Sequence, residues 1–180
     1  MVFLLSIFML YYDNKNNTSD DLSVINSSDK IKKTTDNIIK DIRYFSIDDR
    51  GNSYEIVSDL GEINLDNPDL IFMTNVVATI NLKNSSNVVI TSKFADFNNK
   101  NYETTFYENV KILRDNEKIS SQKLEFSLEK DLILISNKVI LEKPGFNLKA
   151  DRVEIDLITK NSKIFMDNST KKVIAIGKNK

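Results

Sequence analysis

The sequence predicts an all-β fold built from a repeated strand unit, and three observations support that prediction. Apolar and polar residues alternate in short runs from Asp41 onward, and turn residues separate these runs. No run keeps a 3.6-residue period long enough to predict a helix. A similar segment recurs every 29 to 34 residues, which is typical of a repeated structural unit. The 180 residues suffice for one domain with a hydrophobic core.

The composition excludes several classes of function. The chain has no His and no Cys, so the usual zinc sites and the Ser-His or Cys-His nucleophilic pairs cannot form. Its net charge of −1 gives no basic excess for nucleic acid. Four glycines are too few for glycine-dense calcium repeats, and there is no glycine-rich phosphate loop. We therefore expect no cofactor and no enzyme activity, and a small β-sandwich hydrolase is the weakest alternative.

The chain begins with an apolar segment, residues 1–12, which is interrupted only by Ser6. A transmembrane helix needs about 20 such residues. No basic residue precedes the segment, and no cleavage site of small residues follows it. We interpret it as part of a membrane anchor whose start lies upstream; a cleaved signal peptide and a buried strand or core helix are the alternatives. Residues 13–40 are mostly polar and are expected to form a linker, which leaves residues 41–180 for the β-domain.

The β-domain is expected to begin with a strand pair joined by a tight turn. Residues 42–47 and 53–58 are apolar-alternating runs, and residues 48–52 between them are typical of a turn. Gly51 is the residue expected to adopt a positive φ. Asn replaces Gly at other expected turns, because Asn also tolerates a positive φ. These asparagines are Asn64, Asn98, Asn99 and Asn137.

Four segments that align without gaps define the repeat. They start at Ile56, Ile90, Ile119 and Leu148, at separations of 34, 29 and 29 residues. Each has an aliphatic residue first, a small residue third, an acid seventh and an apolar residue eighth. The acids are Glu62, Asp96, Glu125 and Glu154. A second run that starts with Asn follows three of the segments, at Asn75-Val76, Asn109-Val110 and Asn137-Lys138-Val139.

The spacing within each unit predicts a bend in the strand. Strict alternation would place the first and third residues on one face and the sixth and eighth on the other. A one-residue bulge returns all four to the same face and bends every strand in mid-course. The expected inward set is Ile56, Ser58, Ile63, Ile90, Phe97, Ile119, Phe126, Leu148, Ala150, Val153 and Ile155. The acids then face solvent, opposite Lys93, Lys123, Lys149 or Arg152 on neighbouring strands, which is a more ordinary role than metal binding.

The segment at residues 43–58, RYFSIDDRGNSYEIVS, resembles the opening pattern of the LptC family, the inner-membrane component of lipopolysaccharide export. The unit apolar-x-small-x-x-apolar-acid-apolar, followed by Asn-Val-x-Ile, is similar to the repeat shared by LptC, LptA and the periplasmic part of LptD, over about residues 40–168. The resemblance implies a twisted β-jellyroll, open along one edge, whose apolar interior holds acyl chains. It also implies a single-pass inner-membrane protein with a periplasmic β-domain. The apolar segment is shorter than the family's transmembrane helix.

The resemblance further implies that the protein accepts lipopolysaccharide from an inner-membrane ABC transporter and passes it to a periplasmic LptA-like protein. The lipid-contacting candidates are Tyr54, Ile56, Ile63, Ile90, Phe97, Phe106, Ile119, Phe126, Leu148 and Ile155, for which ordinary core packing is the alternative. The transporter-edge candidates are Arg43, Tyr44, Phe45 and Ile47. The LptA-edge candidates are Ile164, Met166, Val173 and Ile174. A soluble LptA-like shuttle and a structural β-repeat domain with a filled interior are the alternative functions.

Overall fold

The structure is a computed structural model that describes residues 37–47, 51–81, 83, 86–127, 130, 132–156, 159, 161–168 and 170–177. The expected membrane anchor and most of the expected linker lie outside these residues. Within the described ranges, no helix has the length and apolar character needed to cross a membrane.

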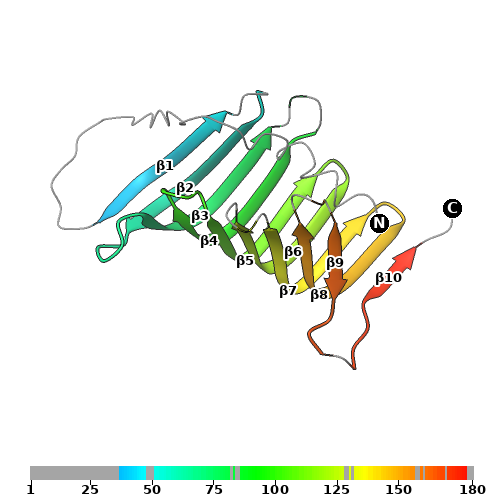
Figure 1. Cartoon of the computed structure of the whole chain (residues 1–180). Coiled ribbons are helices and arrows are strands. Elements are labelled where there is room, and N and C mark those ends of the chain that lie inside the picture. The colour runs from blue at the N-terminus through cyan, green and yellow to red at the C-terminus, as the bar shows by residue number, and fades with distance from the viewer. Residues whose placement is uncertain are drawn as a thin grey trace.

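The described residues form ten strands in one antiparallel sheet (Figure 1). The strands are β1 (Ile38–Ile47), β2 (Ser53–Ile63), β3 (Leu70–Asn81), β4 (Val88–Asn98), β5 (Thr104–Arg114), β6 (Glu117–Ser127), β7 (Leu132–Lys143), β8 (Phe146–Asp156), β9 (Ser162–Phe165) and β10 (Ile174–Gly177). Strands β1 to β8 pair in chain order, and β9 and β10 both pair with β8. The sheet begins at Ile38, before the expected boundary at Asp41. Gly51, between β1 and β2, has the expected positive φ, 80°.

The strands that carry the repeat bend where the sequence predicts a bulge. In β4, Ser92 and Ala95 are both buried although three positions separate them. The third and sixth residues of the other units, in β2, β6 and β8, are also both buried. The predicted inward phase is therefore confirmed, with Ile63 and Phe126 half-buried against the core. The predicted place of the bulge is wrong, however. The pairing register shifts at the level of the bend from the β4–β5 pair to the β7–β8 pair, and each shift leaves the extra residue in β5 or β7, not in the strands that carry the repeat.

Two of the small third residues stabilise the bend directly. The hydroxyl of Ser92 donates a hydrogen bond to the backbone carbonyl of Phe94 (2.8 Å), and Ser121 does the same to Lys123 (3.2 Å). A bulge disrupts the ladder of hydrogen bonds locally, so a short hydroxyl side chain can satisfy a carbonyl group there. Serine at this position therefore serves the backbone as well as the packing of the interior.

The intervening strands β3, β5 and β7 bend through residues with a positive φ. These residues are Asn75 (56°), Glu108 (58°), Asn109 (57°), Asn137 (65°) and Lys138 (66°). Because Asn adopts this left-handed conformation more readily than most residues, the conformation explains the recurring Asn-Val pattern. Asn137 is thus confirmed at a positive φ, although it lies within a strand and not in a turn.

The other three asparagines do not adopt the positive φ that the sequence suggested; Asn64, Asn98 and Asn99 correct that expectation. Asn64 and Asn98 shape their turns through the side chain. The Oδ1 of Asn64 accepts a hydrogen bond from the N–H of Asp66 (2.9 Å), and that of Asn98 accepts one from Lys100 (2.9 Å). These are Asx turns, a second reason why Asn is common where strands connect.

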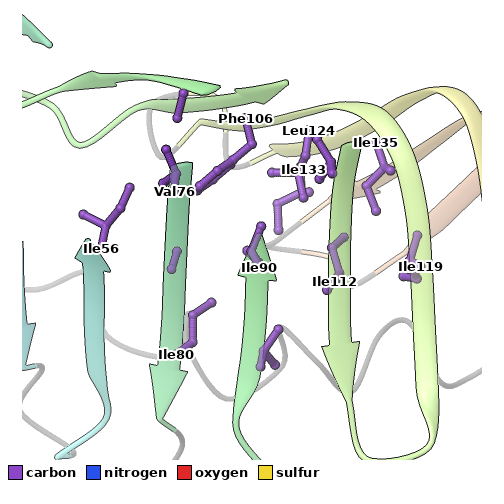
Figure 2. Close-up of a cluster of buried hydrophobic side chains, with 14 of the residues drawn as sticks. Ile56, Val76, Ile80, Ile90, Phe106, Ile112, Ile119, Leu124, Ile133 and Ile135 are labelled. Carbon is purple, nitrogen blue, oxygen red and sulfur yellow. The ribbon is translucent and has the colours of Figure 1, made fainter. Parts of the chain in front are cut away.

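The line of bends divides the sheet into two layers (Figures 1 and 2). Layer 1 contains residues 42–47, 53–58, 76–81, 88–92, 110–114, 117–121, 139–143 and 146–150 with β10. Layer 2 contains residues 38–40, 60–63, 70–74, 94–98, 104–107, 123–127, 132–136 and 152–156 with β9. Figure 2 shows Ile90 and Ile112 of layer 1 and Phe106 and Leu124 of layer 2 in the space between the layers. The hydrophobic core therefore lies between the two halves of one bent sheet.

Gly61 lies at the sixth position of its unit, where the other three units have Ala95, Leu124 and Val153. A Cβ atom at Gly61 would overlap the Cδ1 methyl group of Ile42. The side chain of Ile42 in β1 thus occupies the space that a side chain of the repeat fills elsewhere. Glycine here is a consequence of packing, because Gly61 does not have a positive φ.

Candidate functional site

All ten lipid-contacting candidates face the interior between the two layers. Seven are at most 7% exposed: Ile56, Ile90, Phe97, Phe106, Ile119, Leu148 and Ile155. The other three, Tyr54, Ile63 and Phe126, are partly buried and pack against the same core. The structure thus brings together apolar residues of β2, β4, β5, β6 and β8 on one continuous surface.

The two layers meet through apolar contacts. The rings of Tyr44 in layer 1 and Phe97 in layer 2 have their centroids 4.7 Å apart, although their strands β1 and β4 are not paired. Two hydrogen bonds near the turns each stay on one side of the line of bends: the Lys83 N–H donates to Asn52 Oδ1 (3.0 Å) next to layer 1, and the Ser127 hydroxyl donates to Glu103 (2.6 Å) next to layer 2. Separating layer 1 from layer 2 would therefore break dispersion contacts such as that between Tyr44 and Phe97, and would leave these two hydrogen bonds intact.

Strand β1 forms one edge of the sheet and carries the four transporter-edge candidates. Arg43 forms an ion pair with Glu55 on the outer face, Phe45 is partly buried there, and Ile47 is 60% exposed. Tyr44 differs from the other three because its ring points inward onto Phe97. Burial raises the pKa of the Tyr44 phenol above its usual value.

The sequence did not reveal two further exposed apolar residues on β1, Ile38 and Ile39, which are 54% and 42% exposed. Both precede the expected domain boundary at Asp41, although with Ile42 they form an apolar run that is expected to lead into the domain. The run Ile38-Ile39-x-x-Ile42 was the available signal, since an apolar run of this kind is typical of a strand.

The LptA-edge candidates surround the opposite edge, where β8 pairs with both β9 and β10. Ile164 in β9, Met166 and Val173 pack against the core. Ile174 in β10 is 52% exposed. The four residues therefore lie at the same end of the sheet but in two different environments.

The outer face of layer 2 carries an aromatic cluster that sequence reasoning missed, formed by Phe72, Phe94 and Tyr107. Ring centroids are 5.4 Å apart for Phe72 and Phe94, and 5.8 Å for Phe94 and Tyr107. The Tyr107 hydroxyl donates to Asp96 Oδ1 (3.3 Å). Burial, followed by the nearby charge of Asp96, raises the pKa of Tyr107 to about 12. Burial also raises the pKa of Asp96, although the Tyr107 hydrogen bond and Lys123 oppose that shift.

The repeated acids face outward as expected, but their partners differ from the expected pairs. Glu125 pairs with Lys123 of the same strand (2.8 Å). Lys93 pairs with Glu108 (3.0 Å), which is not one of the repeated acids. Arg152 likewise pairs with Asp167 (3.3 Å), beyond the end of β9. These are exposed or half-exposed pairs, which contribute little to stability.

The comparison with protein families decides the classification. The sequence matches the model described as "LptC: Lipopolysaccharide-assembly, LptC-related" over residues 1–167. The chain belongs to the LptC-related family. This membership confirms the family that the repeat resembled, and it supports a role of this LptC-family chain in lipopolysaccharide transport. No curated protein matches the chain.

Among solved structures, the LptC-family chain is similar to the crystal structure of LptH, described as the LptA homologous periplasmic component of the conserved lipopolysaccharide transport device from Pseudomonas aeruginosa. The identity is 9% and the TM-score 0.52, and the match covers 70% of this chain and 95% of that chain. A likeness at this identity concerns the fold alone. It confirms an all-β, open antiparallel sheet of the LptA type.

Proposed function

We propose that this LptC-family protein accepts lipopolysaccharide from an inner-membrane ABC transporter and passes it to a periplasmic LptA-like protein. The acyl chains lie between layer 1 and layer 2 during the transfer. One observation carries the proposal: the ten apolar candidates share one interior, and the two layers that enclose it meet through apolar contacts.

The energetics of this interior suit a carrier. Each buried methylene group of an acyl chain contributes roughly 0.8 kcal/mol. Acyl chains that enter must separate side chains that now contact each other, such as Tyr44 and Phe97, and this offsets part of the gain. The net affinity is therefore moderate, which a protein that has to release its lipid requires.

The two edges of the sheet supply the contacts with the neighbouring proteins. Exposed strand edges readily accept a further strand, and they usually need protection from aggregation. We propose that β1 pairs with the transporter and that the edge around β8 pairs with the LptA-like protein. Residues 1–12 anchor the protein in the inner membrane in this scheme, and the β-domain lies in the periplasm.

The test is photo-crosslinking with lipopolysaccharide at inward and outward positions of the same sheet. Phe97 and Phe126 face the interior, whereas Asp96 is the outward neighbour of Phe97. A crosslinking amino acid at Phe97 or Phe126 should capture lipopolysaccharide, and one at Asp96 should not. Phe72 is the matched control, because it is aromatic but lies on the outer face. Equal labelling at all four positions would contradict lipid binding between the layers.

A further inference from the structure

Strand β8 is shared between two short strands that differ in how firmly they are held. Strand β9 pairs with residues 152–155 of β8, and β10 pairs with residues 146–149. The guanidinium of Arg152 lies 4.2 Å from the centroid of the Phe165 ring and 3.3 Å from Asp167. Ile164 of β9 packs against the core. Side-chain contacts thus hold β9 and Asp167, two residues after it, on layer 2.

Strand β10 itself lacks comparable contacts, although Val173, the residue before it, packs against the core. All four of its residues are exposed, and Ile174 and Ile176 are 52% and 56% exposed. In the part of the chain that the structure describes, residues 172–177 form no side-chain hydrogen bond or ion pair. A cavity of about 210 Å³, lined in part by Phe146, Asn147 and Ile176, lies beside the strand. The family match also ends at residue 167, before β10.

The large apolar residues of β10 lie on the outer side of the sheet, away from the core. Ala175 is paired with Leu148, a buried residue on the inner face, and so lies on the inner side of the sheet. The two large residues, Ile174 and Ile176, therefore lie on the outer side. Inner positions of the neighbouring strands hold large apolar side chains, such as Ile119 in β6 and Leu141 in β7. Strand β10 thus pairs with the backbone of β8 but contributes only one small side chain, Ala175, opposite the buried Leu148.

We propose that β10 is a placeholder, a strand that pairs with β8 only until the strand of a partner β-domain displaces it. Residues 146–150 of β8 are then the docking edge for that partner strand. The incoming strand replaces the backbone hydrogen bonds of β10 one for one. Leu148 is already buried with β10 in place, so the gain comes from the incoming strand itself: its inward side chains, Val, Ile or Leu, add more apolar surface to the core than Ala175 does, which favours the exchange. The proposal deepens the proposed function, because the partner it names is the LptA-like protein.

A reversible crosslink tests the exchange in the full chain. Asn147 and Ile176 are directly paired, and both are exposed. The natural chain has no Cys, so Asn147→Cys/Ile176→Cys introduces one disulfide that locks β10 onto β8. The matched control, Ile38→Cys/Glu62→Cys, locks the paired and exposed residues of β1 and β2 at the opposite edge.

Binding is measured to the purified LptA-like protein of the same organism, with each variant oxidised and then reduced. Oxidation of the β8–β10 variant should weaken binding by about tenfold or more, since the docking edge stays occupied, and reduction should restore it. The control variant should bind equally in both states. Equal binding of the oxidised and reduced β8–β10 variant would overturn the placeholder.

A second measurement decides the inference without a partner. Backbone amides of β10 should exchange hydrogen about a hundredfold faster than those of β9, because only β10 opens locally. Exchange of β10 as slow as that of β9 would overturn the placeholder on its own. If the unmodified chain fails to bind the LptA-like protein, the proposed partner is wrong, and the exchange rates still test the release of β10.

Discussion

The contact between Tyr44 and Phe97 offers the sharpest test of how the two layers meet. Phe97 is 2% exposed, and its ring lies 4.7 Å from that of Tyr44 across the interior. Phe97→Ala should destabilise the protein by about 3–5 kcal/mol, as for other buried Phe residues. An aromatic pair contributes about 0.5–1.5 kcal/mol beyond burial, so a double-mutant cycle with Tyr44→Leu should show a coupling energy of this size.

Urea unfolding of the wild type, both single variants and the double variant gives the four free energies of unfolding that the cycle needs. Phe72→Ala is the control, because its ring lies on the outer face and contacts Phe94, not Tyr44. It should cost only about 1 kcal/mol and show no coupling to Tyr44→Leu. A coupling energy of zero between Tyr44 and Phe97 would refute the close approach of the layers at this point.

Three further results follow from individual residues. Gly61→Ala should lower the free energy of unfolding by about 1–3 kcal/mol, because its Cβ overlaps a methyl group of Ile42. Adding Ile42→Val removes that methyl group and should recover most of the lost stability; no recovery would exclude the clash. Lys138→Gly should raise the free energy of unfolding by about 0.5–1 kcal/mol, because the φ of Lys138 is 66° and glycine adopts this conformation without strain. A lower melting temperature of the variant would contradict backbone strain at Lys138. The difference in phenolate absorbance between the wild type and Tyr107→Phe reports the ionisation of Tyr107 and should have its midpoint near pH 12. Asp96→Asn should lower this midpoint. A wild-type midpoint near pH 10 would contradict the burial of Tyr107 and its contact with Asp96.

The sign of the Tyr107 effect on stability follows from its raised pKa. The protonated phenol is favoured in the folded state, so its contribution is complete below the unfolded value of about 10. The contribution is lost as the pH rises towards 12. Alkaline unfolding in this window should therefore be weaker in Tyr107→Phe than in the wild type.

The inward face of the sheet was predictable because the repeat contains its own phase. Ser92 and Ala95 are three positions apart and yet are both small and flanked by apolar partners, which indicates a bend between them. The same spacing recurs in all four copies of the repeat. The sequence did not show that the extra residues of the bulges lie in β5 and β7. The recurring Asn-Val was visible as well, but its cause, a left-handed residue within a strand, became clear only from the backbone of Asn109 and Asn137.

Features that depend on neighbours far away in the chain were not predictable. The inward direction of Tyr44 is defined by Phe97, which lies on a strand that does not pair with β1. The aromatic cluster requires the register that brings Phe94 beside Tyr107. The division of β8 between β9 and β10 likewise depends on pairing, because the sequence of a four-residue strand does not reveal which half of a longer strand it joins.

Methyl NMR of isoleucine during a titration with lipopolysaccharide tests most directly whether acyl chains lie between the layers. Ile56, Ile90 and Ile155 are inward and at most 4% exposed, whereas Ile47 and Ile174 are 60% and 52% exposed. The proposed function predicts large shifts for the three inward methyl groups and little change for the two exposed ones. Shifts confined to Ile47 and Ile174 would contradict it and would indicate that lipopolysaccharide binds the outer surface.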